Sequence, residues 1–237
     1  MYVCPFTREQ FLLFMKKNAV VAEIGVAEAV FSKSILQQTN PRELHLIDPW
    51  EHQVLEAYST DLNNISDTGH EARYQKIVKD FKTQMDNNQV FLHRAFSTDA
   101  ACLFSEGYFD WVYIDAMHTE EAVLEDLNAY WPLVREDGFI FGHDYANNPG
   151  AVSQKFGVIE GVNKFVQEKD AVLFAITMDA FPSYILSRKN NPNLELLEKK
   201  LKYSAPFLFE VRDYPKSGDF LQKYFKIEDR EGLVFSF

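Results

Sequence analysis

Cysteine is scarce in this 237-residue chain, which contains only Cys4 and Cys102. Two thiols are too few for a disulfide framework or for a cysteine-rich zinc site. We therefore expect both thiols to be reduced, with Cys102 buried. The first residues, MYVCPFTREQ, also lack the basic and then apolar stretches of a signal peptide. Together these absences predict a cytoplasmic protein.

A long hydrophobic run is missing as well, because no stretch approaches the ~20 apolar residues that a transmembrane helix needs. Basic residues are the minority charge: 24 Lys and Arg oppose 35 Asp and Glu, and the formal net charge is −11. An acidic surface repels phosphate backbones. The sequence therefore predicts that neither membranes nor nucleic acids are partners of this protein.

Hydrophobic residues make up 46% of the chain, including 21 Phe and 11 Tyr, which is enough to fill the core of one sizeable domain. Short apolar runs alternate with segments of helical period. We expect strands at 20–24, 44–47, 90–92, 109–114, 139–142, 173–176 and 184–186, and helices at 7–17, 28–38, 67–85, 159–168 and 194–201, with further helices ending at 102 and beginning at 119. This alternation is typical of an α/β fold with a Rossmann-like, doubly wound, mostly parallel sheet and helices on both faces.

The chain is predicted to have two parts. Residues 1–190 hold the alternating strands and helices. The turn-forming Asn190-Asn191-Pro192 then opens a C-terminal extension, residues 191–237, which is expected to pack on the domain or to form an oligomer contact. The aromatic residues of this extension leave a homodimer open.

Four ionisable residues follow two strands of the segment Phe109 to Tyr145. Asp115 and His118 come after the first strand, and His143 and Asp144 come directly after the second. Ligands of open α/β sheets bind outside the carboxyl ends of the strands. The segment is therefore predicted to bring four acid, base or metal-binding groups to the expected site.

Glycine is scarce in the turn that follows the first long strand. A dinucleotide fold would have the pattern G-x-G-x-x-G there, but the sequence after Glu23-Ile24 is GVAEAV, with the single glycine Gly25. Glu28 also stands where the start of a helix would meet a phosphate. These features argue against NAD. A turn rich in carboxylates suits a cofactor with positive charge, such as S-adenosylmethionine with its sulfonium and ammonium groups.

Asp48 ends the next strand. An acidic residue at this place can accept hydrogen bonds from both ribose hydroxyls of a nucleoside cofactor. The alternative interpretation is that Asp48 caps the turn into Pro49.

Three stretches, VAEIGVAEAVFSKSIL, ELHLIDPW and YIDAMHTEEAVLEDLNAYWPLVREDGFIFGHDY, resemble class I S-adenosylmethionine-dependent methyltransferases. The closest subgroup is methyltransferase family 24, similar in layout to metal-assisted O-methyltransferases, and the resemblance covers about residues 20–188. It implies that Glu23 and Gly25 form the cofactor turn and that Asp48 binds the ribose.

The resemblance also implies that Phe96 and Ser97 lie at the adenine and that Asp115 faces the cofactor. The chain departs from its relatives at two positions. They often carry Gly-Asp-Ser where this chain has Ala95-Phe96-Ser97, so the adenine amine loses a carboxylate partner and gains a stacking face. They commonly keep a glycine at Ala29.

In the metal-assisted enzymes, the positions of Asp115, His143 and Asp144 hold Mg²⁺. Mg²⁺ prefers oxygen ligands, so a ligating His143 would favour Mn²⁺, Fe²⁺ or Zn²⁺. The alternative interpretation is that these residues and His118 hydrogen-bond one another and position a substrate without a metal. His118 is the candidate general base, since its ordinary pKa is near neutrality; alternatively it caps the helix that follows.

The predicted function is methyl transfer from S-adenosylmethionine to a hydroxyl of a small-molecule acceptor, with or without a metal ion, and with His118, Asp115 and Asp144 as catalytic residues. Loops at 51–66 and 146–158 are expected over the site, and Glu125 and Asp126 on a solvated helix face. Two alternatives stay open: a nicotinamide-dependent oxidoreductase, and a non-catalytic binding module that keeps the fold.

Overall fold

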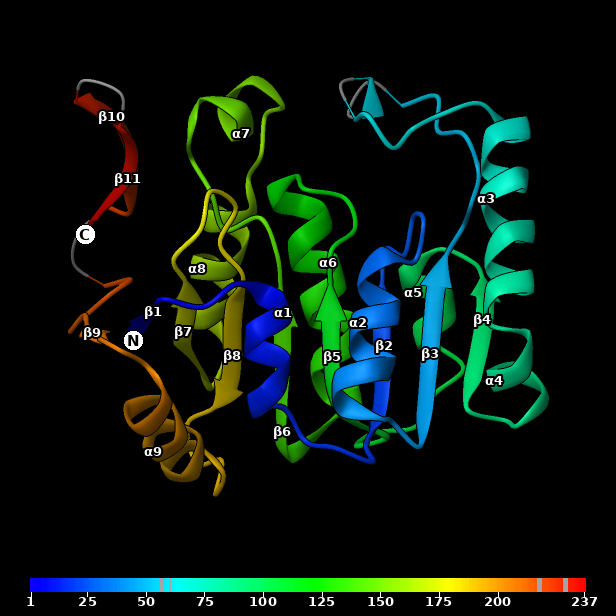
Figure 1. The fold of residues 1–237 in the computed structure, drawn as a ribbon, viewed down its shortest axis with the longest axis horizontal. Helices are drawn as coiled ribbons and strands as arrows, with labels where there is room; N and C mark the ends of the chain where they lie inside the picture. Colours follow the sequence, from blue (N-terminus) through cyan, green and yellow to red (C-terminus); the bar gives the residue numbers. More distant parts are fainter. Residues whose placement is uncertain (56–57, 60, 217–218, 228–229) are drawn as a thin grey trace.

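The computed structural model describes residues 1–55, 58–59, 61–216, 219–227 and 230–237. Over these residues the fold is built on a nine-stranded sheet in the order β4-β3-β2-β5-β6-β8-β7-β1-β9. The strands in Figure 1 are β1 (Tyr2–Cys4), β2 (Val20–Ile24), β3 (Glu43–Asp48), β4 (Val90–Arg94), β5 (Phe109–Ile114), β6 (Val134–Gly142), β7 (Ala171–Thr177), β8 (Tyr184–Arg188) and β9 (Phe209–Glu210).

Parallel pairing in the centre of the sheet brings strand ends together. β2 pairs in parallel with β3 and β5, β3 with β4, and β5 with β6, whereas β8 runs antiparallel to β6 and β7. Every residue of β2 and β5 is buried, as expected for strands covered on both faces. The carboxyl ends of β2 to β6 therefore lie on one edge, and the predicted mostly parallel, doubly wound sheet is confirmed.

Helices cover both faces of the sheet (Figure 1). They are α1 (Arg8–Phe11), α2 (Val30–Thr39), α3 (Asp67–Asp80), α4 (Lys82–Asp86), α5 (Ser97–Ala101), α6 (Glu120–Tyr130), α7 (Pro149–Ser153), α8 (Val158–Glu168) and α9 (Leu194–Ser204). One buried cluster joins α6 and α8 to the sheet through residues such as Leu127 and Phe165. A separate cluster joins α1, α2 and α9 to it through Phe11, Ile35 and Leu201. The two clusters are the two cores of a layered α/β fold.

The residues after 190 contact the rest of the chain at several points. Leu197 and Leu201 of α9 are buried, and β9 pairs with β1. The Tyr214 hydroxyl lies 2.5 Å from the Tyr145 hydroxyl. β10 (Leu221–Ile227) and β11 (Arg230–Ser236) form an antiparallel hairpin. The division of the chain at residue 190 stays a prediction, as does a homodimer.

Some elements differ from their prediction. β1 has three residues, too few for an alternating pattern to be visible. The helix expected at 7–17 begins with a capping box formed by Thr7 and Gln10 but continues after one turn as a 3-10 helix, Leu12–Phe14. The helix expected at 67–85 is interrupted at Phe81. Cys102 is exposed, not buried, because it directly follows the short α5.

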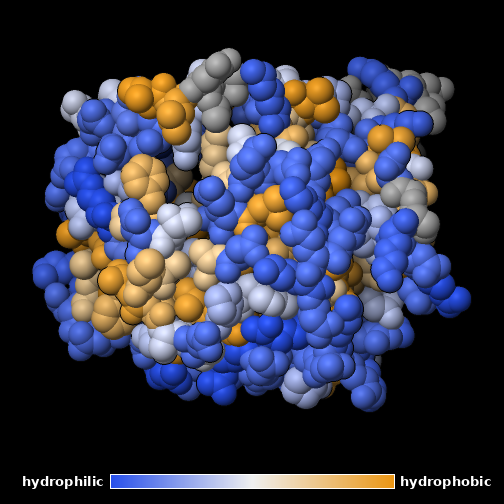
Figure 2. Space-filling view, turned by 180° about the vertical axis from the view of Figure 1, so that it is seen from behind, coloured by the Kyte–Doolittle hydropathy of each residue, from blue (hydrophilic) through white to orange (hydrophobic). Residues whose placement is uncertain are grey.

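Figure 2 shows the molecule from behind. Hydrophilic residues cover most of this face, and hydrophobic residues gather toward its lower left. Among the described residues, no helix combines the length and the apolar character that crossing a membrane requires.

Candidate active site

A cavity of about 610 Å³ opens at the carboxyl edge of the sheet. Its walls come from the turn after β2, the end of β3, the start of α5 and the loop after β5. All residues predicted to bind the cofactor line it: Glu23, Gly25, Asp48, Phe96, Ser97 and Asp115. The sequence thus predicted correctly that these side chains, which are far apart in the chain, converge at one place.

The loop expected over the site at 51–66 also lines the cavity, through Glu51, Gln53, Tyr58, Asp61, Asn63 and Asn64. Residues 56, 57 and 60 of this loop lie outside the described residues. The other expected loop, 146–158, contains α7 and reaches His118 instead: the Phe156 and His118 rings are 4.3 Å apart. The two loops therefore border different parts of the site.

Gly25 allows two strands to meet closely at the floor of the cavity. Its φ is +82°, and a Cβ atom added there would lie 2.1 Å from the backbone oxygen of Asp115. Only glycine fits such a position, because both the backbone conformation and the space exclude a side chain. The single glycine of the turn therefore lets the ends of β2 and β5 approach.

The rest of this turn uses the left-handed conformation without glycine. Ala27 has φ +48° and Ala29 has φ +57°, and Ala29 is the N-cap of α2. For a residue with a Cβ this conformation costs about 1–2 kcal/mol. Ala29, which stands where the relatives commonly keep a glycine, therefore has the backbone conformation that a glycine would adopt, but this conformation is strained.

Asp48 holds this turn in place. Its Oδ2 accepts hydrogen bonds from the backbone N–H groups of Val26 (3.0 Å) and Ala27 (2.9 Å), and its Oδ1 accepts one from Trp50 (2.7 Å). The structure therefore shows Asp48 in the turn-capping role that was the alternative interpretation. Oδ2 thus uses both of its lone pairs and Oδ1 uses one, so one acceptor position of Asp48 remains for a ligand in the cavity that it lines. Ribose binding stays a prediction.

Glu23 lies beneath the turn, with only 2% of its surface exposed. The Ser32 hydroxyl donates a hydrogen bond to it. Burial raises the pKa of the Glu23 carboxyl to about 8, since a charge is unfavourable in an apolar surrounding. Without a ligand, Glu23 is therefore mostly protonated at neutral pH.

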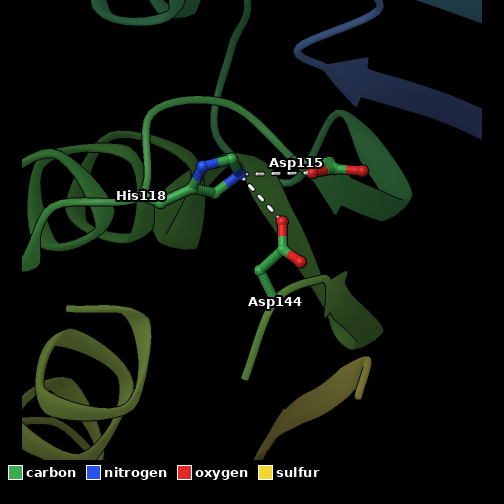
Figure 3. A group of neighbouring side chains, drawn as sticks. All are labelled: Asp115, His118 and Asp144. Atoms are coloured by element: carbon green, nitrogen blue, oxygen red, sulfur yellow. Dashed lines mark ion pairs between the residues drawn. The ribbon is translucent and has the colours of Figure 1, made fainter. Parts of the chain in front are cut away.

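The second half of the site gathers Asp115, His118 and Asp144, as predicted (Figure 3). His118 Nε2 lies 2.9 Å from Asp144 Oδ2 and 3.6 Å from Asp115 Oδ1. Burial opposes the charged imidazole, but the two carboxylates outweigh it and raise the pKa of His118 to about 10. Burial also opposes the charge on Asp144, yet His118 and His143 hold the pKa of this carboxyl below its usual range.

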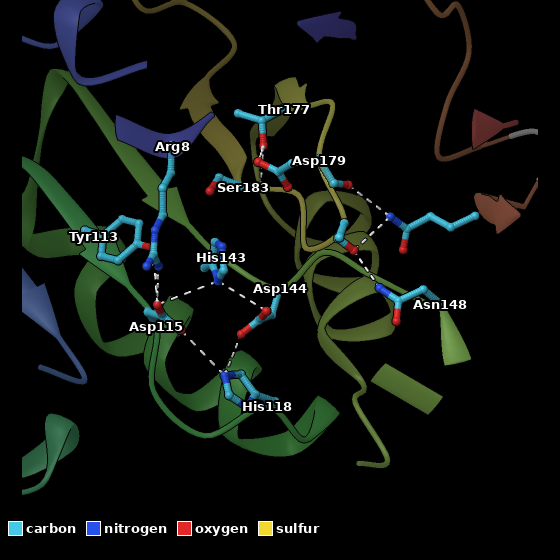
Figure 4. A network of polar contacts seen from close by, with 12 residues as sticks. Arg8, Tyr113, Asp115, His118, His143, Asp144, Asn148, Thr177, Asp179 and Ser183 are labelled. Atoms are coloured by element: carbon cyan, nitrogen blue, oxygen red, sulfur yellow. Dashed lines mark hydrogen bonds and ion pairs between the residues drawn. The ribbon is translucent and has the colours of Figure 1, made fainter. Parts of the chain in front are cut away.

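His143 lies on the other side of the same carboxylates (Figure 4). Its Nδ1 is 3.2 Å from Asp144 Oδ1 and 3.7 Å from Asp115 Oδ2. Burial lowers the pKa of His143, but Asp115 and Asp144 raise it to a net value above the ordinary one. Neither His143 nor Asp144 belongs to the cavity wall, so the cluster begins where the cavity ends.

Arg8 is a site residue that the sequence did not reveal. Its guanidinium donates hydrogen bonds to Asp115 Oδ2 (3.0 Å) and to the Tyr113 hydroxyl (2.9 Å), and it lines the cavity. No local pattern could have found it, because α1 and β5 are brought together only by the fold.

The donor set fits a divalent metal, with one change from the prediction. One atom each of Asp115, His118 and Asp144 lie within 4.8 Å of one another, so His118 joins the two predicted carboxylate ligands, and a ligand role of His143 stays a prediction. His118 Nε2 is buried beside these two carboxylates, and in the neutral form of the imidazole it is a suitable ligand atom for a transition metal.

Asp126 contradicts its prediction. It was expected on a solvated helix face, but only 4% of its surface is exposed, and it lines the cavity. The helical period of Val123, Leu127 and Tyr130 places position 126 on their buried face, so this signal was present in the sequence. Glu125 is exposed at the rim, as predicted.

A parallel sheet with a cavity beside a single-glycine turn, at the point where β2 lies between β3 and β5, defines a class I methyltransferase architecture. The sequence agrees, since the profile of methyltransferase family 24, described as "Methyltransferase domain", matches residues 22–145. The chain belongs to this family and is an S-adenosylmethionine-dependent methyltransferase. No curated protein sequence matches the chain.

Solved structures share the fold at low sequence identity. Spermidine synthase from Thermotoga maritima is 13% identical with a TM-score of 0.50, and the match covers 90% of this chain and 68% of that one. The trans-methyltransferase CalH in complex with SAH is 13% identical (TM-score 0.51; 75% and 54%). A methyltransferase homologue from Pyrococcus horikoshii is 12% identical (TM-score 0.51; 74% and 63%). At this identity the likeness shows the fold alone.

Proposed function

We propose that this enzyme transfers the methyl group of S-adenosylmethionine to a hydroxyl group of a small-molecule acceptor. One observation carries the proposal: Asp115 belongs to both halves of the site. It lines the cavity beside Gly25, and its two oxygens face His118 and His143 of the ionisable cluster. A donor in the cavity would therefore lie next to groups that can take a proton from an acceptor.

The charge of the cavity supports a cationic donor. Acidic side chains outnumber basic ones in its wall, and they include Glu28, Asp48, Asp115 and Glu125. Attraction to these groups favours sulfonium and ammonium groups, and it disfavours the pyrophosphate of a nicotinamide cofactor. Together with the single glycine of the turn, this charge argues against the oxidoreductase alternative.

The cluster supplies the acceptor side. Methyl transfer is an in-line displacement at carbon, so holding the nucleophile, the methyl carbon and the sulfur in line is the largest need. Asp144 orients His118, and a neutral His118 would remove the proton of the acceptor hydroxyl. With its pKa at about 10, the resting imidazole is protonated, and it becomes a base only when that proton has been displaced.

A divalent ion is the alternative to His118 as the base. Asp115, His118 and Asp144 would hold it, and His118 would then be a neutral ligand that takes no proton from the acceptor. When bound, such an ion lowers the pKa of a coordinated hydroxyl. The ion is part of the proposal, and the methyl transfer itself does not depend on it.

The test uses Asp144, which is outside the cavity wall. Asp144→Ala and the milder Asp144→Asn are expected to lose at least about 100-fold in turnover, the usual range for a group that positions a general base, while the Kd for S-adenosylhomocysteine stays within about twofold. Transfer of labelled methyl to a panel of small hydroxyl compounds measures the first quantity, and calorimetry measures the second. Asp170→Ala, a carboxylate that pairs with Lys189 at the surface, is the matched control.

Three results would contradict the proposal. Thermal stabilisation by NADH and not by S-adenosylhomocysteine would favour the oxidoreductase. Absence of affinity for S-adenosylmethionine at millimolar concentration would favour the binding module. Full turnover in Asp144→Ala would show that the ionisable cluster takes no part in the reaction.

A further inference from the structure

A buried carboxylate without a cationic partner forms part of the cavity wall. Asp126 is 4% exposed, and among the residues that the structure describes it makes no ion pair. Its carboxyl has a side-chain hydrogen bond with Ser97, and burial raises the pKa of this carboxyl to about 6. A carboxylate has room for about four hydrogen bonds, so Asp126 retains acceptor capacity.

The surroundings of Asp126 are held rigidly. The Tyr130 hydroxyl donates a hydrogen bond of 2.8 Å to the backbone oxygen of Ser97, and Ser97 in turn contacts Asp126. Asp126 and Tyr130 belong to the same helix, α6, and Ser97 begins α5. The carboxylate therefore lies at the junction of two helices, where it is shielded from solvent.

An aromatic surface lies in the same part of the wall. Phe96 precedes Ser97, lines the cavity and keeps 40% of its surface exposed. A flat ring and a buried hydrogen-bond acceptor together suit a planar heterocycle with an exocyclic amine: the ring covers the Phe96 surface and the N–H groups satisfy the carboxylate. Of the parts of S-adenosylmethionine, the adenine has this chemistry.

We propose that Asp126 accepts a hydrogen bond from the exocyclic amine of the adenine and selects for this base. This inference rests on the proposed function, because it places the adenosine of the methyl donor in the cavity. An oxygen in place of the amine would meet the carboxylate lone pairs and repel them. Asp126 is thus a residue for donor specificity, supplied by α6 and not by the segment after β4.

The experiment compares two ligands on two variants. S-adenosylhomocysteine and its inosine analogue, S-inosylhomocysteine, differ in the exocyclic group, which is an amine or an oxygen, and at the adjacent N1, which carries a hydrogen only in the inosine ligand. The wild-type protein should bind the adenine ligand about 10- to 100-fold more tightly, the range for a hydrogen bond to a charged group. In Asp126→Asn the preference should fall below about threefold, because an amide can both accept from the amine and donate to the oxygen. Calorimetry measures both affinities.

Glu125→Gln is the matched control, since it removes the same charge from the neighbouring residue of α6 at the cavity rim. It should keep the wild-type preference. Asp126→Ala, checked for folding by circular dichroism, should also lose the preference.

The outcomes separate the two proposals. Equal weakening of both ligands in Asp126→Asn, with the preference intact, would show that Asp126 merely supports Ser97 and would overturn this inference while leaving the donor site standing. Failure of the wild-type protein to bind S-adenosylhomocysteine would overturn the proposed function itself.

Discussion

The Arg8 guanidinium lies 3.0 Å from Asp115 Oδ2, although 107 positions separate the two residues. The same side chain lies over the Phe31 ring, 4.9 Å from its centre. Arg8 precedes the segment that the family profile matches, residues 22–145. The N-terminal helix α1 therefore contributes a positive charge to the junction between the cavity and the ionisable cluster.

Removing that charge should lower both stability and activity. In Arg8→Ala, Asp115 loses its guanidinium partner, and a partly buried carboxylate without it should reduce the free energy of unfolding by about 1–3 kcal/mol. Chemical denaturation measures this loss. Arg212→Ala is the control, because the Arg212 side chain is 81% exposed beside Glu210, and its loss should stay near zero. Equal losses in both variants would contradict a special role for Arg8.

Gly25 should be far less tolerant than another glycine with positive φ. In Gly25→Ala the new methyl group would meet the Asp115 backbone, adding about 1–3 kcal/mol of overpacking to the strain of the left-handed backbone. Gly107 has φ +65° and open space around it, so Gly107→Ala should cost the backbone strain alone, about 1–2 kcal/mol. Thermal unfolding of both variants, with calorimetry of S-adenosylhomocysteine, compares them. Similar stability of the two would argue against the close approach of β2 and β5.

Ala29 should accept glycine better than an ordinary alanine does. Because its φ is +57°, Ala29→Gly relieves about 1–2 kcal/mol of strain. This gain offsets two costs of the substitution: the greater flexibility of the unfolded chain and the loss of a buried methyl group. Ala129 lies within α6, where glycine costs about 1 kcal/mol. We expect denaturant midpoints to fall less for Ala29→Gly than for Ala129→Gly. The reverse order would contradict a strained turn.

Glu23 should make the stability of the unliganded protein depend on pH. Its pKa is raised from 4.5 to about 8 in the folded state, so the unfolded chain releases the proton at lower pH. The free energy of unfolding should therefore fall as the pH rises from 4.5 to 8, by up to about 1.4 kcal/mol per unit. In Glu23→Gln this part of the slope should vanish, whereas in Glu195→Gln, at an exposed helix position, it should persist.

Binding of Mn²⁺ should release protons. At pH 7.5 His118 is protonated, because its pKa is about 10, and a metal ligand must be neutral. Calorimetry in two buffers of different ionisation enthalpy should show proton release of about one or more per ion, growing smaller as the pH approaches 10. Asp144→Asn should weaken the binding, and Asp170→Asn should not. Tight binding without proton release would exclude His118 as a ligand.

Local patterns in the sequence were sufficient for the order of β2 to β8, for most of the helices between them, and for the convergence of the cavity residues. Gly25, Asp48, Asp115 and His118 follow buried strands, and residues in such positions meet at one edge of any parallel sheet. The position of Asp126 was present in the same helical period that located its neighbours, and its charge was wrongly given more weight than that period. A charged side chain is a good predictor of exposure only where the fold offers it no hydrogen-bond or ionic partner.

What the sequence by itself determined is the class of fold and the convergence of the cavity residues, because periodic burial and strand ends are local properties of the chain. Only the tertiary structure decided which side chains contact one another in the site. It placed Arg8 on Asp115, put His118 and His143 on either side of the same two carboxylates, and turned Asp126 toward the cavity. Contacts between elements depend on how distant surfaces pack and on where a charge is desolvated, and neither quantity is written in any short stretch of sequence.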